Sequence, residues 1–169
     1  NQPVEEIFFR MMKFREFDAS EMSLSSYTAS LGQKNPPFIA IPVFPSRFFR
    51  HSCVFVSAQS DVRRPEDLKG KRVGVPEYQQ TAALWTRGAL AHEWGVTAQD
   101  MEWWMERPAS HSHGGATGFK PPPGVTVHPV PVETNLGNMV VEGKLDAVVH
   151  YIVNDNLVDR SKIDLANHP

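Results

Sequence analysis

Residues 65–95 decide the fold, and they read PEDLKGKRVGVPEYQQTAALWTRGALAHEWG. The polar start, with Pro65, indicates a connector, and the short apolar run 72–75 that follows predicts a buried strand. Apolar residues then recur at helical spacing, which predicts a helix over about 80–94. Gly95 ends that helix, because glycine tolerates the left-handed backbone conformation that closes many helices.

The same alternation continues on both sides of this unit. Short apolar or alternating runs predict strands at 17–23, 38–43, 53–58, 101–105, 125–127 and 145–149, and helical patterns predict helices at 3–16, 24–32 and 136–143. Residues 106–124 form a long loop rich in Pro, Gly and His. Strands that alternate with helices indicate an α/β fold with a mainly parallel sheet.

Composition excludes several classes of protein. The 169 residues are 41% hydrophobic and 21% charged, and 17 basic against 19 acidic residues give a net charge of −2. That balance argues against a nucleic-acid partner, which needs a basic surface. No apolar run approaches the roughly 20 residues that span a bilayer, so we expect no membrane insertion. The single cysteine, Cys53, lies in an apolar run and is interpreted as a small buried hydrophobe.

Two motifs and three longer stretches resemble known proteins. DLKGKRVGV (67–75) and GKLDAV (143–148) resemble segments of the type 2 periplasmic-binding-protein-like fold. FDASEMSLSSY (17–27), FPSRFFRHS (44–52) and GVPEYQQTAALWTRG (74–88) are similar to the 4,5-dihydroxyphthalate decarboxylase family.

The resemblance implies an α/β fold of two lobes with a ligand cleft between them. Because family members are longer, the chain looks like a fragment. We expect part of the first lobe at 1–60, a connector at 61–70, the second lobe at 71–150 and the start of a return segment at 151–169.

The implied activity is a carboxy-lyase of aromatic catabolism that acts on a small aromatic carboxylate without a cofactor. We expect a cytoplasmic enzyme and leave an oligomer open. Two alternatives share the fold: a periplasmic solute-binding protein of an ABC-type uptake system for a small anion, and a regulatory effector-binding domain.

The loop 44–52 supplies the cations and the proton donor that such chemistry needs. Arg47 and Arg50 suit a carboxylate, because a guanidinium matches it with two parallel hydrogen bonds. His51 is the first candidate for general acid, with His113 second, because histidine titrates near neutrality. The alternative for Arg47 and Arg50 is that they are solvated surface charges. The alternative for His51 is a loop histidine that hydrogen-bonds to the backbone. Glu21 and Glu77, in their protonated forms, are further candidates for the general acid.

Polar residues also occupy two expected strand-to-helix junctions. Ser23, Ser25 and Ser26 precede or begin one helix, and Tyr78, Gln79, Gln80 and Thr81 precede the next. We expect both junctions to bind substrate, because ligands gather at the carboxyl ends of strands in open α/β sheets. Simple helix capping is the alternative.

His111, His113 and His128 could bind a transition metal, but their spacing is not diagnostic. We therefore assign no metal site.

Overall fold

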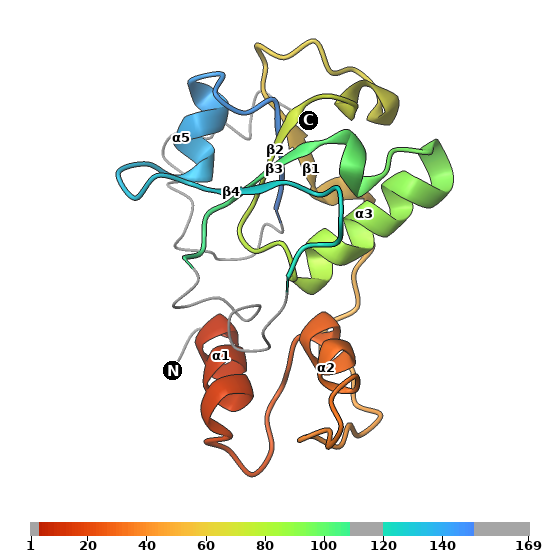
Figure 1. The fold of residues 1–169 in the computed structure, drawn as a ribbon, viewed down its shortest axis with the longest axis vertical. Coiled ribbons are helices and arrows are strands. Elements are labelled where there is room, and N and C mark those ends of the chain that lie inside the picture. Colours follow the sequence, from red (N-terminus) through yellow and green to blue (C-terminus); the bar gives the residue numbers. More distant parts are fainter. Residues whose placement is uncertain (1–3, 109–119, 151–169) are drawn as a thin grey trace.

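A five-stranded sheet organises the molecule in the computed structural model, which describes residues 4–108 and 120–150 (Figure 1). The helices are α1 (Val4–Phe14), α2 (Leu24–Ser30), α3 (Thr81–Trp94) and α5 (Leu136–Val141). The strands are β1 (Val54–Val56), β2 (Arg72–Val75), β3 (Glu102–Met105), β4 (Val127–Pro129) and β5 (Ala147–Val149). Short 3-10 turns occupy His51–Cys53, Pro65–Leu68 and Ala98–Asp100.

The strand order is β1-β5-β2-β3-β4. Strands β5, β2, β3 and β4 pair in parallel, whereas β1 pairs with β5 antiparallel. Val73 in β2 lies opposite Trp103 in β3 and Ala147 in β5, so β2 is in the middle of the parallel part. The prediction of an α/β fold with a mainly parallel sheet is confirmed.

Side-chain alternation gives the sheet two apolar faces, which are covered by helices on opposite sides (Figure 1). The α3 side is packed with Val73, Val75, Trp103 and Val149, all at most 1% exposed. The α5 side is packed by Leu136, Met139, Leu145 and Val148. Cys53 is 2% exposed and free, so its prediction as a buried hydrophobe is confirmed.

Two predicted strands are wrong. Residues 17–23 and 38–43 form neither strand nor helix, and Ile39 is 96% exposed. Pro42 removes a backbone donor from residues 38–43, and Pro36, Pro37 and Pro45 flank them, which disfavours pairing of this segment in a sheet. The strand expected at 125–127 begins two residues later, and the other predicted elements are found within a few residues of their expected bounds.

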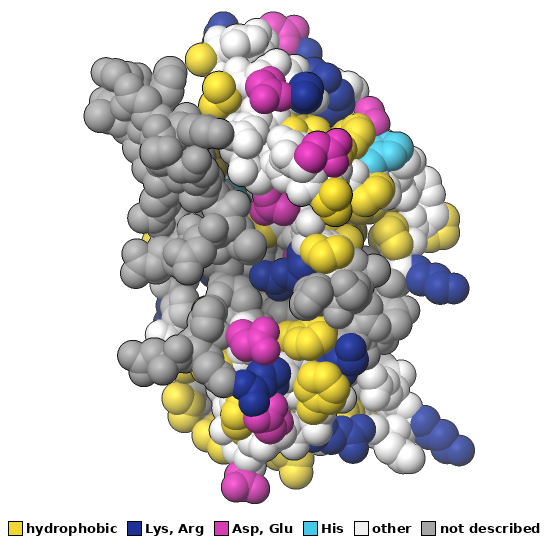
Figure 2. All heavy atoms as spheres, turned by 90° about the vertical axis from the view of Figure 1, so that its left-hand side faces the viewer, with side chains coloured by type: hydrophobic (Ala, Val, Ile, Leu, Met, Phe, Trp, Pro, Cys, Tyr) yellow, Lys and Arg dark blue, Asp and Glu magenta, His cyan; other side chains and the backbone are white. Residues whose placement is uncertain are grey.

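The helices α1 and α2 lie beyond one end of the sheet (Figure 1). The N-terminal part of α2 meets the start of α3 there. Among the described residues, no helix is both long and apolar enough to cross a membrane. Figure 2 shows basic and acidic side chains interspersed on the face that it presents.

Candidate functional site

The two predicted junctions meet in space. The hydroxyls of Ser23 and Thr81 share a hydrogen bond of 2.8 Å, and the Ser25 backbone N–H donates to Thr81 Oγ1 at 3.1 Å. The Ser25 hydroxyl donates to the carbonyl of Gln79. Residues separated by more than fifty positions therefore form one polar junction beside the carboxyl end of β2, the edge where ligands bind in open α/β sheets.

The side chains at this junction do not cap their helices. Ser23 is the N-cap of α2 and Gln80 is the N-cap of α3, yet neither side chain makes a capping hydrogen bond. The hydroxyl of Ser26 and Oε1 of Gln80 are buried with no hydrogen-bond partner among the described residues. Simple capping, the alternative interpretation, does not explain Ser23, Ser26 and Gln80.

A buried ion pair joins the segments that follow β2 and β3. Glu77 is 1% exposed, and its Oε2 accepts from Arg107 Nη1 at 2.9 Å. His150 follows β5 at the same edge, is 6% exposed and donates its backbone N–H to the carbonyl of Cys53. Arg107 and His150 were missed from sequence, although Arg107 stands two residues after one predicted strand and His150 stands directly after another.

Arg87 in α3 is a second buried cation that sequence reasoning missed. Its guanidinium carbon lies 3.7 Å from the ring centre of Tyr78 and 5.5 Å from that of Trp103. Burial lowers the pKa of Arg87 to about 10, so it remains charged near neutrality. Burial also raises the pKa of Tyr78, an effect that the charge of Arg87 partly offsets.

Arg47 and Arg50 lie in the irregular segment before β1. Arg47 stacks over Phe44 at 5.7 Å, and Arg50 stacks over Phe48 at 5.3 Å. The carbonyl of Arg50 accepts from the Thr86 hydroxyl in α3 at 3.4 Å. No hydrogen bond among the described residues joins either guanidinium to the polar junction.

His51 lies near the other end of α3 from the junction. Its Nε2 is 2.8 Å from Glu93 Oε1, its ring packs edge-on against Trp94, and both partners of the ion pair are about half exposed. The twelve positions from Thr81 to Glu93 correspond to about 18 Å of helix. The structure thus places His51 apart from the residues that it was expected to accompany.

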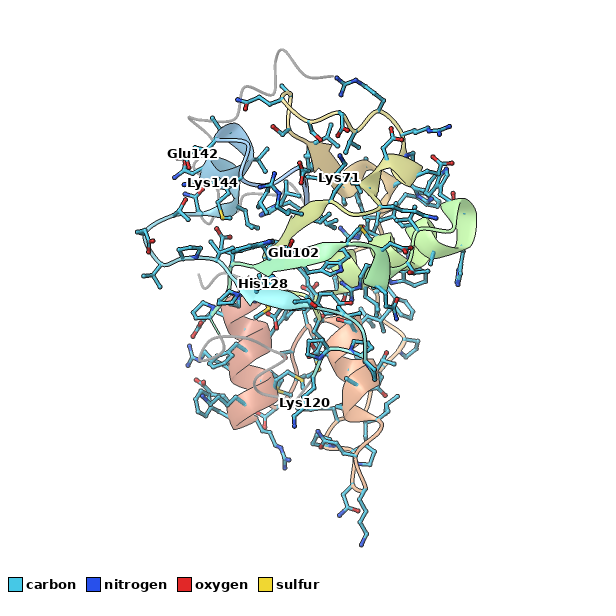
Figure 3. The ribbon with its side chains drawn as sticks, turned by 45° about the horizontal axis from the view of Figure 1, so that its top comes forward. Lys71, Glu102, Lys120, His128, Glu142 and Lys144 are labelled. Atoms are coloured by element: carbon cyan, nitrogen blue, oxygen red, sulfur yellow. The ribbon has the colours of Figure 1, made fainter. Side chains whose placement is uncertain are left out.

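The other predicted histidines do not form a described cluster. His111 and His113 lie outside the described residues. His128 on β4 stacks on Trp104 at 4.9 Å and pairs with Glu102 on β3 at 2.9 Å (Figure 3). Within 4–108 and 120–150, no three potential metal ligands converge.

A shallow hollow lies at the opposite edge of the sheet, near the amino ends of β3 and β4. Its lining includes Asp100, Glu102, Thr126 and His128. Ligands of open α/β sheets gather at the carboxyl ends instead, so the polar junction is the better candidate site.

Known proteins give an independent comparison. No protein-family model matches the chain. A 4,5-dihydroxyphthalate decarboxylase of Comamonas testosteroni is 43% identical over 148 residues, which cover 88% of this chain and 45% of that protein. A 4,5-dihydroxyphthalate decarboxylase of Pseudomonas putida is 40% identical over 148 residues, which cover 88% of this chain and 57% of that protein. The chain thus spans about half the length of these relatives, and its predicted resemblance to the 4,5-dihydroxyphthalate decarboxylase family is confirmed.

Proposed function

We propose that the whole protein decarboxylates 4,5-dihydroxyphthalate to 3,4-dihydroxybenzoate. The observation that carries this proposal is the 40–43% identity to two proteins of that name over 88% of the chain. The polar junction supports it, because hydroxyl and amide groups suit an aromatic ring that bears hydroxyls and carboxylates.

The proposed architecture is the two-lobed, type 2 periplasmic-binding-protein-like fold. Residues 1–60 would contribute to the first lobe, 61–70 would connect, 71–150 would form most of the second, and 151–169 would begin the return. Within this proposal β1 crosses over to join the sheet of the second lobe, since it pairs with β5. The contact between α2 and the start of α3 supports a substrate site between the lobes.

The proposed reaction uses the ring's own electrons. Each hydroxyl of the substrate lies para to a carboxylate, so its deprotonation pushes electron density onto the carbon that bears that carboxylate. A proton donor adds a proton to this carbon, the carbon–carboxylate bond breaks, and carbon dioxide leaves as its electron pair returns to the ring. One proton replaces one carboxylate, and no electron-sink cofactor is required.

The proposed substrate contacts come from both sides of the junction. Ser23 and Ser25 would bind from α2, and Tyr78, Gln79, Gln80 and Thr81 would bind from the segment between β2 and α3. Arg47 and Arg50 are proposed as carboxylate clamps from the neighbouring segment. Their alanine variants should raise the KM for the dicarboxylate more than they raise the inhibition constant of catechol, which has no carboxylate, whereas equal losses would contradict the assignment.

His51 is proposed as the proton donor, with His113 as the second candidate. Because Glu93, the partner of His51, lies about 18 Å along α3 from Thr81, this role requires the reacting carbon to lie near the far end of α3 rather than at the polar junction. The observation that supports it is the 2.8 Å contact between His51 Nε2 and Glu93 Oε1, which fixes the orientation of the ring. His51→Gln should preserve binding and lower single-turnover decarboxylation by about two to four decades. His92→Gln, at an exposed position of α3, is the matched control. Undiminished chemistry in His51→Gln would remove it from this role.

The decisive experiment incubates the full-length protein with 4,5-dihydroxyphthalate and measures carbon dioxide and 3,4-dihydroxybenzoate. We expect the two products in equal amounts and none from phthalate, which lacks the hydroxyls. A cytoplasmic location fits this activity. Tight binding without carbon dioxide release would overturn the proposal and favour a periplasmic solute-binding protein.

A further inference from the structure

The guanidinium of Arg87 is a buried cation with no acidic partner among the described residues. The residue is 9% exposed, Nη1 is buried without a hydrogen-bond partner, and no described carboxylate lies within ion-pair distance. Its described neighbours are the rings of Tyr78 and Trp103.

The largely buried Arg107 has an acidic partner, because its guanidinium reaches Glu77 at 2.9 Å. The more exposed Arg72 also has one, Asp146, at 3.0 Å. A buried charge without a counter-charge is destabilising, because desolvation is not offset by Coulomb attraction. Cation–π contacts offset only part of that cost. An anionic ligand would supply the missing charge.

The direction of the side chain favours such a ligand at the polar junction. Side chains on a helix tilt toward its N-terminus, so the guanidinium of Arg87 reaches back toward Tyr78 and the start of α3. Gln80 lies seven residues earlier, two turns along the same side of α3, and its buried Oε1 also lacks a described partner. The hydroxyl of Ser26 in α2 is likewise buried without a hydrogen-bond partner among the described residues.

These three groups are chemically complementary to one kind of molecule. A guanidinium donates to a carboxylate, and a serine hydroxyl can do the same. The amide oxygen of Gln80 accepts from a phenolic hydroxyl. The aromatic rings beside Arg87 suit a planar ligand.

We propose that Arg87 binds a carboxylate of the aromatic substrate at the polar junction, as a carboxylate-binding residue in addition to Arg47 and Arg50. This proposal deepens the proposed function and rests on it for the identity of the substrate.

Two unreactive probes test the proposal in the full-length protein. Phthalate carries the carboxylates without the hydroxyls, and catechol carries the hydroxyls without the carboxylates. Arg87→Met should weaken calorimetric binding of phthalate about tenfold to a hundredfold and change that of catechol less than threefold. Arg87→Lys, which keeps the charge but not the bidentate geometry, should fall between. Arg64→Met removes the same charge at an exposed site and is the matched control.

Thermal unfolding of the ligand-free protein separates binding from structure. Because methionine removes an unpaired buried charge and keeps most of the volume, Arg87→Met should leave Tm unchanged or raise it. A lowered Tm with loss of both ligands would assign Arg87 a structural role and overturn the proposal. The proposal would also be overturned if phthalate bound Arg87→Met as tightly as the unaltered protein, or if the unaltered protein did not bind phthalate. The two proposals can fail separately. If Arg87→Met selectively loses phthalate binding but the unaltered protein releases no carbon dioxide from 4,5-dihydroxyphthalate, the role of Arg87 is supported and only the decarboxylase function is contradicted.

Discussion

Gly74 shows how one residue sets the spacing between two layers. It lies in the middle of β2 and faces α5, where a Cβ would come within 2.6 Å of Leu136 and 2.8 Å of Leu145. Both leucines are essentially buried. Glycine is required by this close approach of side chains to the strand rather than by a left-handed backbone conformation.

We predict that Gly74→Ala lowers the free energy of unfolding by about 1–3 kcal/mol, the usual cost of overpacking a core. Gly88→Ala is the matched control, because nothing lies within 4 Å of a Cβ there. In the interior of α3 that change should raise stability by roughly 0.5–1 kcal/mol. Chemical denaturation of both variants measures the difference, and equal effects would contradict the packing argument.

At the scale of elements, the hydroxyl of Thr81 joins α2 to α3. It accepts from the Ser25 backbone and shares hydrogen bonds with the hydroxyls of Ser23 and Ser25. Since α2 has only seven residues, its own turns contribute little stability in isolation. The position of α2 therefore depends on this contact.

Thr81→Val keeps the shape of the side chain and removes the hydroxyl. We predict a loss of about 1–3 kcal/mol in unfolding free energy, because the buried partners lose hydrogen bonds. Hydrogen exchange of the α2 amides should speed up selectively. Thr28→Val is the control, because within the described part of the chain its exposed hydroxyl bonds only to the Leu24 carbonyl of the same helix. Unchanged exchange in Thr81→Val would show that α2 is held by other contacts.

A second link between elements runs from Arg72, at the start of β2, to Asp146, just before β5. The Asp146 carboxylate accepts from the backbone N–H and the Nε of Arg72, both at 3.0 Å. Burial raises the pKa of Asp146, but hydrogen bonds from Arg72 and its charge outweigh that effect, so the pKa is lowered overall.

The lowered pKa predicts how this link responds to acid. A carboxyl group whose folded-state pKa is below its unfolded value stabilises the fold above about pH 4 and loses that contribution as pH falls through the folded-state pKa. Asp146→Asn should therefore cost about 1.5–3 kcal/mol at pH 7. The difference from the unaltered protein should shrink below pH 4. Denaturation at several pH values measures both, and a constant difference would contradict this assignment.

At the scale of the whole molecule, the proposed reaction draws its electrons from the substrate hydroxyl. We therefore predict that prolonged dialysis of the full-length protein against a chelator leaves decarboxylation unchanged. A control with phthalate excludes background release of carbon dioxide. Loss of activity that Zn²⁺ or Mn²⁺ restores would contradict this prediction and point to His111, His113 and His128 as ligands.

The sequence by itself determined the local elements and the class of fold. Apolar periodicity located β2 and α3, because burial on one face imposes a period of 2 on strands and 3.6 on helices. Alternation of the two predicted a parallel sheet, and the polar residues after β2 predicted a site at its carboxyl edge. The segment 38–43 misled this reasoning, since its apolar residues have the propensity of a strand but find no neighbouring strand.

Only the tertiary structure decided which polar residues meet. Hydrogen bonds between Ser23 and Thr81 depend on how α2 packs against α3, and no local pattern encodes a contact across 58 positions. The separation of His51 from the polar junction was also decided by the tertiary structure. The motif at 44–52 places His51 next to Arg50 in the chain, but it does not say how far His51 lies from other segments. Arg87 falls within the predicted helix at 80–94, and its burial against Tyr78 and Trp103 follows from packing alone.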